Sequence, residues 1–469
     1  MTAAAVVRPP VRGAAPAAPT PAPVHRRWWP DAVAAFTWLT CLVVLALWEY
    51  GGGVGQLVGG TAAALGSVGR LSGLLSANLL LLQVLGMARI PWAERSFGQD
   101  RLARWHRWVG FTSFHLMLLH LVTIVVAYAL VDRTGVLGEA WTMLRTYPGM
   151  LLALAGTVLI GMVVVTSVRA ARRRLRYESW HLLHLYAYLG VGLALPHQLW
   201  TGTDFVANPW ARAYWWTLYG AALVAVVAFR LVAPWRTSVR HRLRVAQVVP
   251  DVDDLVHVRM TGHDLQRLRV APGQFFVFRF LAGPGWTRGH PLSLSAAPTT
   301  DGLRVTVGVR GDDGRRIAGL RPGTRVLVEG PYGRLTPEVL RRPRMTAVAA
   351  GSGIAPVLAL LHARPGRGDV LLHRTRVPSA GPLGTELAAL PALTYLPLTG
   401  RRARHGTAWL PAEHADVPGP AALLALSPDI SHHDVVVCGP GPWTDAVLRD
   451  LRTAGVPDDA VHVERYDWE

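Results

Sequence analysis

Six apolar stretches in the first half of the chain constrain its fold more than any other feature. Each approaches or exceeds the roughly 20 residues that a helix needs to cross a bilayer. They lie at about 31–50, 72–91, 106–130, 148–167, 178–199 and 212–233. The Gly-rich stretch 51–71 is too interrupted by glycine to count as a seventh span. The sequence therefore predicts a six-helix transmembrane bundle at 28–235, preceded by a disordered cytoplasmic tail at 1–27.

The charge pattern predicts the orientation of this bundle. The chain has 469 residues, 51% of them hydrophobic, and a net charge of +18 to which lysine contributes nothing. Arginines gather before the first span, between the second and third, between the fourth and fifth, and after the sixth. By the positive-inside rule, both termini and the C-terminal half are cytoplasmic, and membrane topology explains the charge better than nucleic-acid binding does. The two cysteines exclude a disulfide framework and a cysteine-based metal site.

Two of the apolar stretches carry three histidines each, and ionisable side chains inside a membrane span are costly and usually functional. On the third span, His106 and His120 are fourteen residues apart, which is about 21 Å along a helix and nearly the same face. On the fifth span, His184 and His197 are thirteen residues apart, which leaves an ideal helix about 140° off that face. We expect Pro196, just before the second of these, to supply the distortion that corrects the mismatch.

We predict that these histidines form two axial pairs, His106 with His184 for an inner haem and His120 with His197 for an outer haem. Two neutral imidazoles saturate a haem iron, which favours electron transfer over oxygen binding. The alternative is that all four are core or interfacial histidines with satisfied hydrogen bonds.

The histidine motifs also carry a family resemblance. HRWVGF followed by a later histidine on the third span, and WHLLH followed by PH on the fifth, resemble the ferric reductase/NADPH oxidase transmembrane family. This resemblance implies six helices and two haems b, held by histidine pairs from the third and fifth helices. The positions in this sequence that match the family's ligands are His106, His120, His184 and His197.

The second half of the chain shows a different periodicity. Short β-like runs follow one another as RLRVAQVVP, LVHVRM, FFVFRFL, LRVTVGV and RVLVEG, which predicts a small antiparallel β-barrel at 240–340. The next segment, MTAVAAGSGIAPVLALLHA, reads as a buried strand, a glycine turn and a helix. Further strand candidates are DVLLH, ALTYLPL and DVVVCG. These patterns predict a parallel α/β nucleotide-binding domain at 341–469.

Four motifs in this half, GHPLSLSAAP, VEGPYG, AAGSGIAP and VVCGPGPW, resemble the ferredoxin–NADP reductase superfamily in the arrangement used by ferric reductases. The resemblance implies FAD on the barrel and NADPH or NADH on the α/β domain. The residues that it places along the flavin are His290, Pro291, Leu292 and Ser293. Among these, Ser293 is expected to hydrogen-bond near the reactive nitrogen of the flavin.

The same resemblance implies a nucleotide site. The residues expected at the phosphate turn of the nicotinamide nucleotide are Gly351, Gly353 and Pro356. The residues expected near the nicotinamide are Cys438, Gly439 and Pro440. Together with Ser293, Cys438 is an expected catalytic residue. Arg374 follows the predicted strand DVLLH, where its guanidinium could pair with a 2′-phosphate and favour NADPH over NADH.

Some positions depart from the pattern of the superfamily. Leu292 stands where an aromatic ring is expected to stack on the flavin. Gly314 stands where threonine or serine usually contacts the flavin pyrophosphate, and we expect the charge of Arg315 to compensate there. An aromatic residue near the C-terminus is expected to cover the flavin, and both Tyr466 and Trp468 are candidates.

Together these features predict a transmembrane oxidoreductase. Electrons would pass from cytosolic NAD(P)H through FAD and two haems b to an extracytoplasmic acceptor, with ferric iron as the expected acceptor and dioxygen, reduced to superoxide, as an alternative. A second alternative is a flavin reductase on an inert membrane anchor with structural histidines. A third is a proton channel or transporter in which the histidines relay protons. The pattern leaves the oligomeric state and the need for a partner subunit open.

Overall fold

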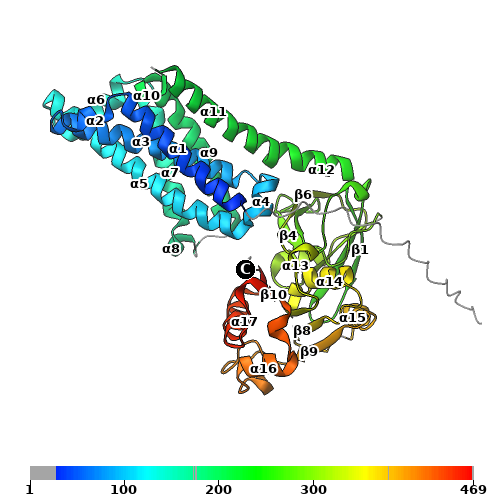
Figure 1. The fold of residues 1–469 in the computed structure, drawn as a ribbon. Coiled ribbons are helices and arrows are strands. Elements are labelled where there is room, and N and C mark those ends of the chain that lie inside the picture. Colours follow the sequence, from blue (N-terminus) through cyan, green and yellow to red (C-terminus); the bar gives the residue numbers. More distant parts are fainter. Residues whose placement is uncertain are drawn as a thin grey trace, which may run out of the picture. The chain divides into compact units, whose positions relative to one another are not determined.

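A computed structural model of the chain describes residues 28–172, 174, 177–206, 208–300, 302–378 and 380–466. The predicted tail at 1–27 and Trp468 lie outside these described residues. The chain divides into two compact units, one formed by His25–Arg236 and the other containing Thr237–Glu469. Figure 1 follows the elements of each unit along the sequence.

The first unit is built from helices. They are α1 (Trp29–Tyr50), α2 (Gly53–Leu57), α3 (Thr61–Met87), α4 (Pro91–Phe97), α5 (Gln99–Asp132), α6 (Val136–Thr146), α7 (Met150–Ser167), α8 (Arg169–Arg172), α9 (Tyr177–Trp200), α10 (Thr203–Val206) and α11 (Pro209–Val226). A π-helical segment, Val227–Val232, continues α11 into α12 (Ala233–His241). In Figure 1 the short helices α2, α6 and α10 gather at one end of this bundle.

Five helical segments in the described part of the chain are long and apolar enough to cross a membrane. They are Asp31–Tyr50, Thr61–Met87, Arg101–Asp132, Met150–Ser167 and Pro209–His241. They correspond to five of the six predicted spans. The remaining predicted span forms the 24-residue helix α9, whose histidines, tyrosines and proline lower its mean hydropathy, so a sixth crossing stays a prediction. Helix α3 begins at Thr61 instead of 72 because the alanine-rich stretch after Gly60 is a good helix former.

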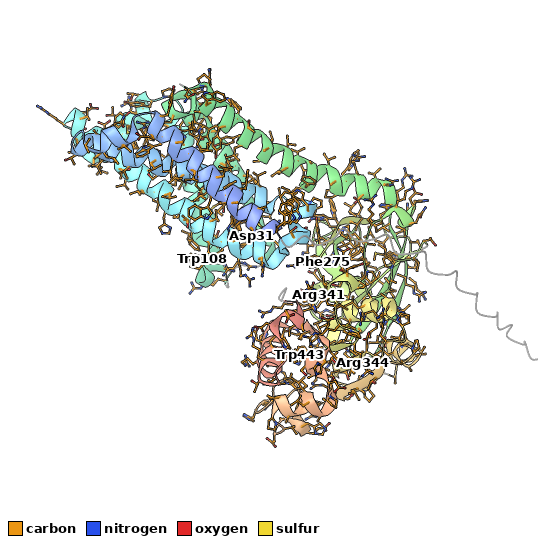
Figure 2. All side chains as sticks on the ribbon, in the orientation of Figure 1. Asp31, Trp108, Phe275, Arg341, Arg344 and Trp443 are labelled. Carbon is orange, nitrogen blue, oxygen red and sulfur yellow. The ribbon has the colours of Figure 1, made fainter. Side chains whose placement is uncertain are left out.

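Packing inside this unit is organised around two helix pairs. Helix α3 lies along α5, α7 lies along α9, and α1 and α11 pack on α3. The shared apolar cluster includes Trp48, Leu81 and Trp215. Many large apolar side chains point outward, among them Trp108 with 75% of its surface exposed (Figure 2). An apolar exterior of this kind is expected where lipid is the solvent.

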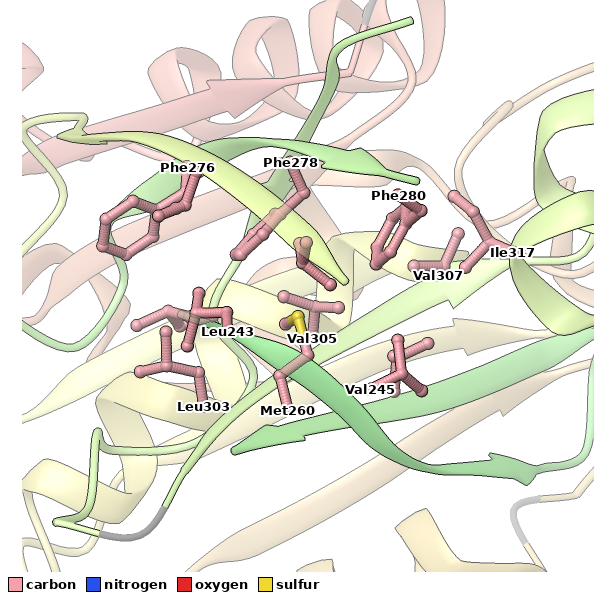
Figure 3. Close-up of a cluster of buried hydrophobic side chains, with 14 of the residues drawn as sticks. Leu243, Val245, Met260, Phe276, Phe278, Phe280, Leu303, Val305, Val307 and Ile317 are labelled. Atoms are coloured by element: carbon pink, nitrogen blue, oxygen red, sulfur yellow. The ribbon is translucent and has the colours of Figure 1, made fainter. Parts of the chain in front are cut away.

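The first part of the second unit contains six strands, which pair as two three-stranded antiparallel sheets in the orders β1-β2-β5 and β4-β3-β6. The strands are β1 (Arg244–Pro250), β2 (Leu255–Thr261), β3 (Phe275–Phe280), β4 (His290–Ser293), β5 (Leu303–Gly308) and β6 (Val326–Tyr332). Alternate residues of both sheets form one apolar core, in which Phe276, Phe278 and Met260 are completely buried (Figure 3). Helix α13 (Gly311–Ala318) follows β5 and closes this core with Ile317. The antiparallel pairing predicted for this region is therefore present.

The second part is a five-stranded parallel sheet in the order β11-β10-β7-β8-β9. Its elements are β7 (Met345–Ala350), α14 (Ile354–Ala363), β8 (Val370–Thr375), α15 (Pro382–Ala388), β9 (Thr394–Thr399), α16 (Gly419–Leu426), β10 (Asp434–Gly439), α17 (Gly441–Thr453) and β11 (Val461–Arg465). Helices α14 and α15 cover one face of the sheet, and α16 and α17 cover the other. The chain leaves β7 towards β8 on one side and returns to β10 on the other. The carboxyl ends of β7 and β10 therefore mark a switch point, where α/β sheets bind ligands.

A group of charged side chains joins the two parts of the second unit. Arg304 on β5 contacts both carboxylate oxygens of Glu386 on α15, at 2.6 and 2.9 Å, and His362 Nε2 on α14 lies 2.6 Å from Glu386 Oε1. Burial opposes ionisation of Glu386. The hydrogen bonds from His362 and Arg304 outweigh that effect and lower the pKa of Glu386 to about 2.

This shift makes the stability of the second unit depend on pH. Because the pKa of Glu386 in the folded state lies below its unfolded value of about 4.3, its stabilising contribution is complete above about pH 4.3 and is lost as the pH falls towards 2. We expect Glu386→Gln to lower Tm at pH 7 by about 2–4 °C, or about 1 kcal/mol after allowance for solvent screening. Between pH 7 and pH 2 the Tm of the variant, measured by calorimetry, should decrease less than the Tm of the wild type. The exposed Glu338, replaced by Gln, is the control, and identical pH profiles for Glu386→Gln and wild type would contradict the assignment.

Candidate functional site

The glycine turn predicted to bind phosphate lies at the switch point of the parallel sheet. Gly351–Gly353 forms a 3-10 turn between β7 and α14. Gly351 has a φ of +55°, a left-handed conformation that favours glycine. A Cβ on Gly353 would lie 2.3 Å from the carbonyl oxygen of Cys438, so only glycine lets this turn approach the end of β10. Pro356 is buried in the first turn of α14, where its missing N–H has no intrahelical partner to lose.

The end of β10 places the residues predicted to lie near the nicotinamide. Cys438 is completely buried, and burial together with the neighbouring Glu464 raises the pKa of its thiol well above the usual value. Cys438 therefore acts as a neutral thiol at physiological pH and not as a thiolate. Gly439 follows, where a Cβ would lie 2.7 Å from the Trp443 ring, and Pro440 then stands at the N-cap position before α17.

Tyr466 connects the end of β10 with β4, the strand predicted to lie along the flavin. Its backbone N–H donates to the Gly439 carbonyl at 3.2 Å, and its hydroxyl lies 3.1 Å from Ser293 Oγ. Burial raises the pKa of Tyr466 well above its usual value, so the phenol stays protonated. Of the two aromatic candidates near the C-terminus, Tyr466 reaches the predicted flavin strand, whereas Trp468 lies outside the described residues.

A small cleft lies where these elements meet. Its lining comes from β4, from β5, from the turn before α14, from the start of α14 and from the C-terminal segment: Pro291, Leu292, Ser293, Thr306, Val307, Gly308, Ser352, Ala355 and Tyr466. The structure thus brings together three of the four residues predicted along the flavin and Tyr466, one of the two aromatic candidates for covering it. The fourth, His290, lies 6.0 Å from Phe280 between ring centroids, and burial lowers its pKa although Asp313 partly opposes this.

Helix α13 holds the two residues predicted near the flavin pyrophosphate. A Cβ on Gly314 would lie 2.3 Å from the Gly308 carbonyl oxygen and 3.1 Å from the Val309 backbone. Close packing of α13 on the end of β5 therefore explains why glycine replaces the usual threonine or serine. The Arg315 side chain is exposed and lies 2.7 Å from Asp312, so part of the charge expected to compensate is already paired.

Arg374, predicted to pair with a 2′-phosphate, is engaged with backbone carbonyls. Its guanidinium donates to the carbonyls of Leu398 at 3.0 Å and Arg401 at 2.8 Å, and also to that of Thr375. Burial lowers the pKa of Arg374. A 2′-phosphate would have to displace these bonds, so this residue gives little reason to prefer NADPH over NADH.

In the helical unit, the structure brings together the predicted inner pair of histidines. His106 on α5 and His184 on α9 have ring centroids 5.7 Å apart, with the planes at 68°. Two imidazoles that share one metal ion through bonds of about 2 Å have centroids about 6 Å apart. Ser167 Oγ lies 3.3 Å from His184 Nδ1 and orients that ring. His106 Nδ1 is buried without a hydrogen-bond partner among the described residues, which is costly for a polar atom in apolar surroundings.

The predicted outer histidines have similar support from the backbone. His120 Nδ1 donates to the Gly69 carbonyl on α3 at 2.8 Å, which leaves Nε2 as the unprotonated nitrogen that a metal requires. A Cβ on Gly73 would lie 2.6 Å from the same imidazole, so glycine provides the space for the ring. His197 on α9 packs against Gly149, and its Nδ1 is likewise buried with no partner in the described part of the chain. The four residues therefore fit axial ligation of haem, while the pairing of His120 with His197 stays a prediction.

Histidine, cysteine and carboxylate side chains do not gather in groups of three or more that could hold a metal ion, as far as the described residues extend. Axial ligation of a haem needs only two. His115 is an unsuitable ligand because its ring is exposed; its Nδ1 bonds to the Phe111 carbonyl at 2.7 Å in its own helix.

Sequence reasoning missed three contributors to these sites. Gly69 lies in the stretch 51–71, which was interpreted as a connection too rich in glycine to be a span, and Gly73 lies at the start of the predicted span 72–91. Thr306 lies in a strand recognised only for its alternation. The short strand β4 was seen as a motif and not as a strand. The one available signal was the spacing of the two glycines by four residues, which places them on one face of a helix.

Both halves of the chain are similar to known proteins. Residues 72–195 match the family model described as the ferric reductase like transmembrane component. The protein-methionine-sulfoxide reductase heme-binding subunit MsrQ of Caulobacter vibrioides is 28% identical over 206 residues, which cover 44% of this chain and 90% of that protein.

The reductase half has relatives of its own. The ferredoxin reductase component of 3-ketosteroid-9-alpha-monooxygenase from Mycolicibacterium smegmatis is 34% identical over 240 residues, covering 47% of this chain and 64% of that protein. The chain thus spans less than two thirds of that relative's length. A crystal structure of a ferredoxin NADP+ reductase from Neisseria gonorrhoeae with bound FAD and NADP aligns at 19% identity and a TM-score of 0.39, covering 48% of this chain and 97% of that one. The chain therefore joins a segment that matches a ferric reductase-like transmembrane component to a half that is similar to ferredoxin reductase components.

Proposed function

We propose that this chain carries electrons from cytosolic NAD(P)H across a membrane to an acceptor on the extracytoplasmic face. The observation that carries the proposal is the juxtaposition of His106 and His184, with ring centroids 5.7 Å apart on two helices of the membrane unit. A membrane anchor has no need of buried histidines that face one another. The same chain holds a reductase half with a cleft between its flavin strand and its nucleotide turn.

The residues of the chain have distinct parts in this proposal. Gly351 and Gly353 let the backbone before α14 approach a phosphate, and the N-terminus of that helix offers unpaired N–H groups to it. Ser293, held by Tyr466, presents its hydroxyl to the cleft. The imidazoles of His106, His120, His184 and His197 would hold the haems. When bound, FAD takes up a hydride and releases single electrons, and haems b conduct those electrons between the two faces.

Ferric iron in a chelate is the acceptor that we propose first, with dioxygen as the alternative. If two imidazoles held each haem iron, no coordination site would be open, so the acceptor would not need to bind the iron, which suits a ferric chelate as well as oxygen. The similarity to a haem-binding subunit of a methionine sulfoxide reductase adds a partner protein as a further candidate acceptor. Proteoliposomes loaded with NAD(P)H on the reductase side, with ferric citrate, dioxygen or a soluble partner outside, separate these acceptors.

The decisive first experiment is a dithionite-reduced minus oxidised spectrum of the purified full chain, with quantification of haem and flavin. We expect about two low-spin haems b and one FAD per chain, and bleaching of the flavin on addition of NAD(P)H. Flavin without haem in a folded protein would instead support a reductase with a membrane anchor and structural histidines. Proton flux through proteoliposomes without oxidation of NAD(P)H would support the transport alternative.

A further inference from the structure

A buried chain of three polar side chains runs from the loop after β1 to the cleft. Asp251 Oδ2 lies 2.6 Å from His257 Nε2, and His257 Nδ1 lies 2.8 Å from Thr306 Oγ1. His257 on β2 and Thr306 on β5 face each other directly in the antiparallel register. The side chains of Asp251 and His257 are at most 5% exposed. Burying polar side chains is costly, and side chains that do not reach water do not contribute to solubility. These three polar groups therefore need another explanation.

The backbone determines which atoms of this chain donate. The N–H of Val252 donates to Asp251 Oδ1 at 2.7 Å, and the N–H of Leu383 donates to Asp251 Oδ2 at 2.8 Å. Both oxygens of this carboxyl group accept backbone N–H bonds, and the geometry assigns the remaining donor, His257 Nε2–H, to the same group. With His257 taken as a neutral imidazole, its other ring nitrogen, Nδ1, is then an acceptor. Thr306 therefore donates its hydroxyl proton to His257.

This arrangement leaves Thr306 Oγ1 with only lone pairs for any further partner. On β5, Val305 and Val307 belong to the core of the sheets, and Thr306 points to the opposite face, where it lines the cleft. The same cleft is lined by Ser293 of the flavin strand and by Ser352 of the nucleotide turn. It therefore lies where the nicotinamide end of a nucleotide would meet a flavin.

We propose that Thr306 Oγ1 accepts an N–H of the nicotinamide carboxamide, and that Asp251 and His257 hold the hydroxyl in this acceptor-only state. This inference rests on the proposed function and deepens it by naming a residue that selects the coenzyme ring. Sites built to hydrogen-bond one group discriminate strongly against analogues that lack it, because their buried polar atom is then unpaired. An amide N–H is also present on the flavin ring, and the experiment separates the two donors.

The test compares the coenzyme that the wild type oxidises with its 3-acetylpyridine analogue, which keeps the carbonyl and lacks the N–H donor. Calorimetric titration of the full-length, flavin-loaded protein gives Kd for the oxidised forms, and stopped-flow absorbance gives flavin reduction by the reduced forms. We expect Thr306→Val to weaken the natural coenzyme about five- to tenfold and to leave the analogue unchanged, whereas Thr306→Ser keeps the preference of the wild type. His257→Phe should reduce the preference as well, because the Thr306 hydroxyl loses its own acceptor.

Thr261→Val, at the exposed end of β2, is the matched control and should bind both coenzymes like the wild type. Equal weakening of both coenzymes by Thr306→Val would overturn the proposal. So would loss of bound flavin with unchanged coenzyme preference, which would assign the N–H donor to the flavin. If the wild type bound neither coenzyme, and if neither reduced coenzyme reduced its flavin, the proposed function itself would be overturned.

Discussion

Replacing either His120 or His197 by alanine is expected to remove one of two haems and to lower NAD(P)H-driven reduction of an external acceptor by at least about 100-fold. Loss of an outer-shell partner of a metal ligand already costs 10- to 100-fold, and loss of the ligand itself exceeds that. Reduction of the flavin by NAD(P)H should continue, because the residues of the cleft belong to the other compact unit. Haem content per chain and the rate of flavin bleaching measure the two effects separately.

His115→Ala is the matched control for these variants. It removes a histidine from the same helix as His120, but this ring is exposed and bonded to the carbonyl of Phe111. The control protein should keep both haems and the full rate of transfer. Retention of both haems by His120→Ala or by His197→Ala would show that the outer pair is wrongly assigned. Loss of haem in the control alone would move the site to His115.

Restoring a hydroxyl residue at position 314 is expected to damage the protein. Gly314→Ser would place a Cβ 2.3 Å from the Gly308 carbonyl oxygen, against backbone that cannot move without shifting β5. Overpacking of this kind costs about 1–3 kcal/mol, and β5 also carries Thr306 of the cleft. We therefore expect a fall in Tm of several degrees and a loss of bound FAD, as measured by calorimetry and by flavin absorbance.

Gly319→Ala separates this clash from a general intolerance of α13 to substitution. Gly319 caps the same helix, has a negative φ of −89°, and would place its Cβ 3.6 Å from the nearest carbonyl oxygens, which is ordinary contact. Its Tm and flavin content should match the wild type. If Gly314→Ser instead bound FAD more tightly at unchanged Tm, glycine at this position would reflect the loss of a hydroxyl contact to the flavin pyrophosphate. Close packing of α13 would then not be the reason for it.

Local patterns predicted much of this fold. The alternation of apolar residues found β1, β2, β3, β5 and β6, and the strand-turn-helix pattern found β7 and α14. Strand β4 was missed as a strand because HPLS contains a proline and only four residues, and β11 because VHVER is short and half polar. Helix α6 was missed inside a predicted loop because its anchoring residues, Glu139 and Met143, are buried by tertiary packing that periodicity does not report.

The candidate site was predictable only as far as motifs reach. The positions of Ser293, Gly353 and Cys438 around one cleft or turn follow from motif order. The partners of Arg374 do not, because two of its carbonyl acceptors come from β9 and the loop beyond it. The reason for Gly314 also depends on a contact between α13 and β5. The roles of such residues depend on contacts with segments far away in the sequence. A single sequence does not reveal these contacts.

The two glycines of α3 give one short pattern a different meaning. Gly69 and Gly73 form G-x-x-x-G in an apolar helix, a pattern usually interpreted as a site where two membrane helices dimerise. Here Gly69 admits Thr123 and Ile124 of α5 within the same chain, and Gly73 admits the ring of His120. A mutational scan would therefore find these positions intolerant of even one methyl group whether or not the protein ever dimerises. In helical bundles with buried histidines, this pattern can therefore indicate the space that a histidine ring occupies, and not a dimer interface.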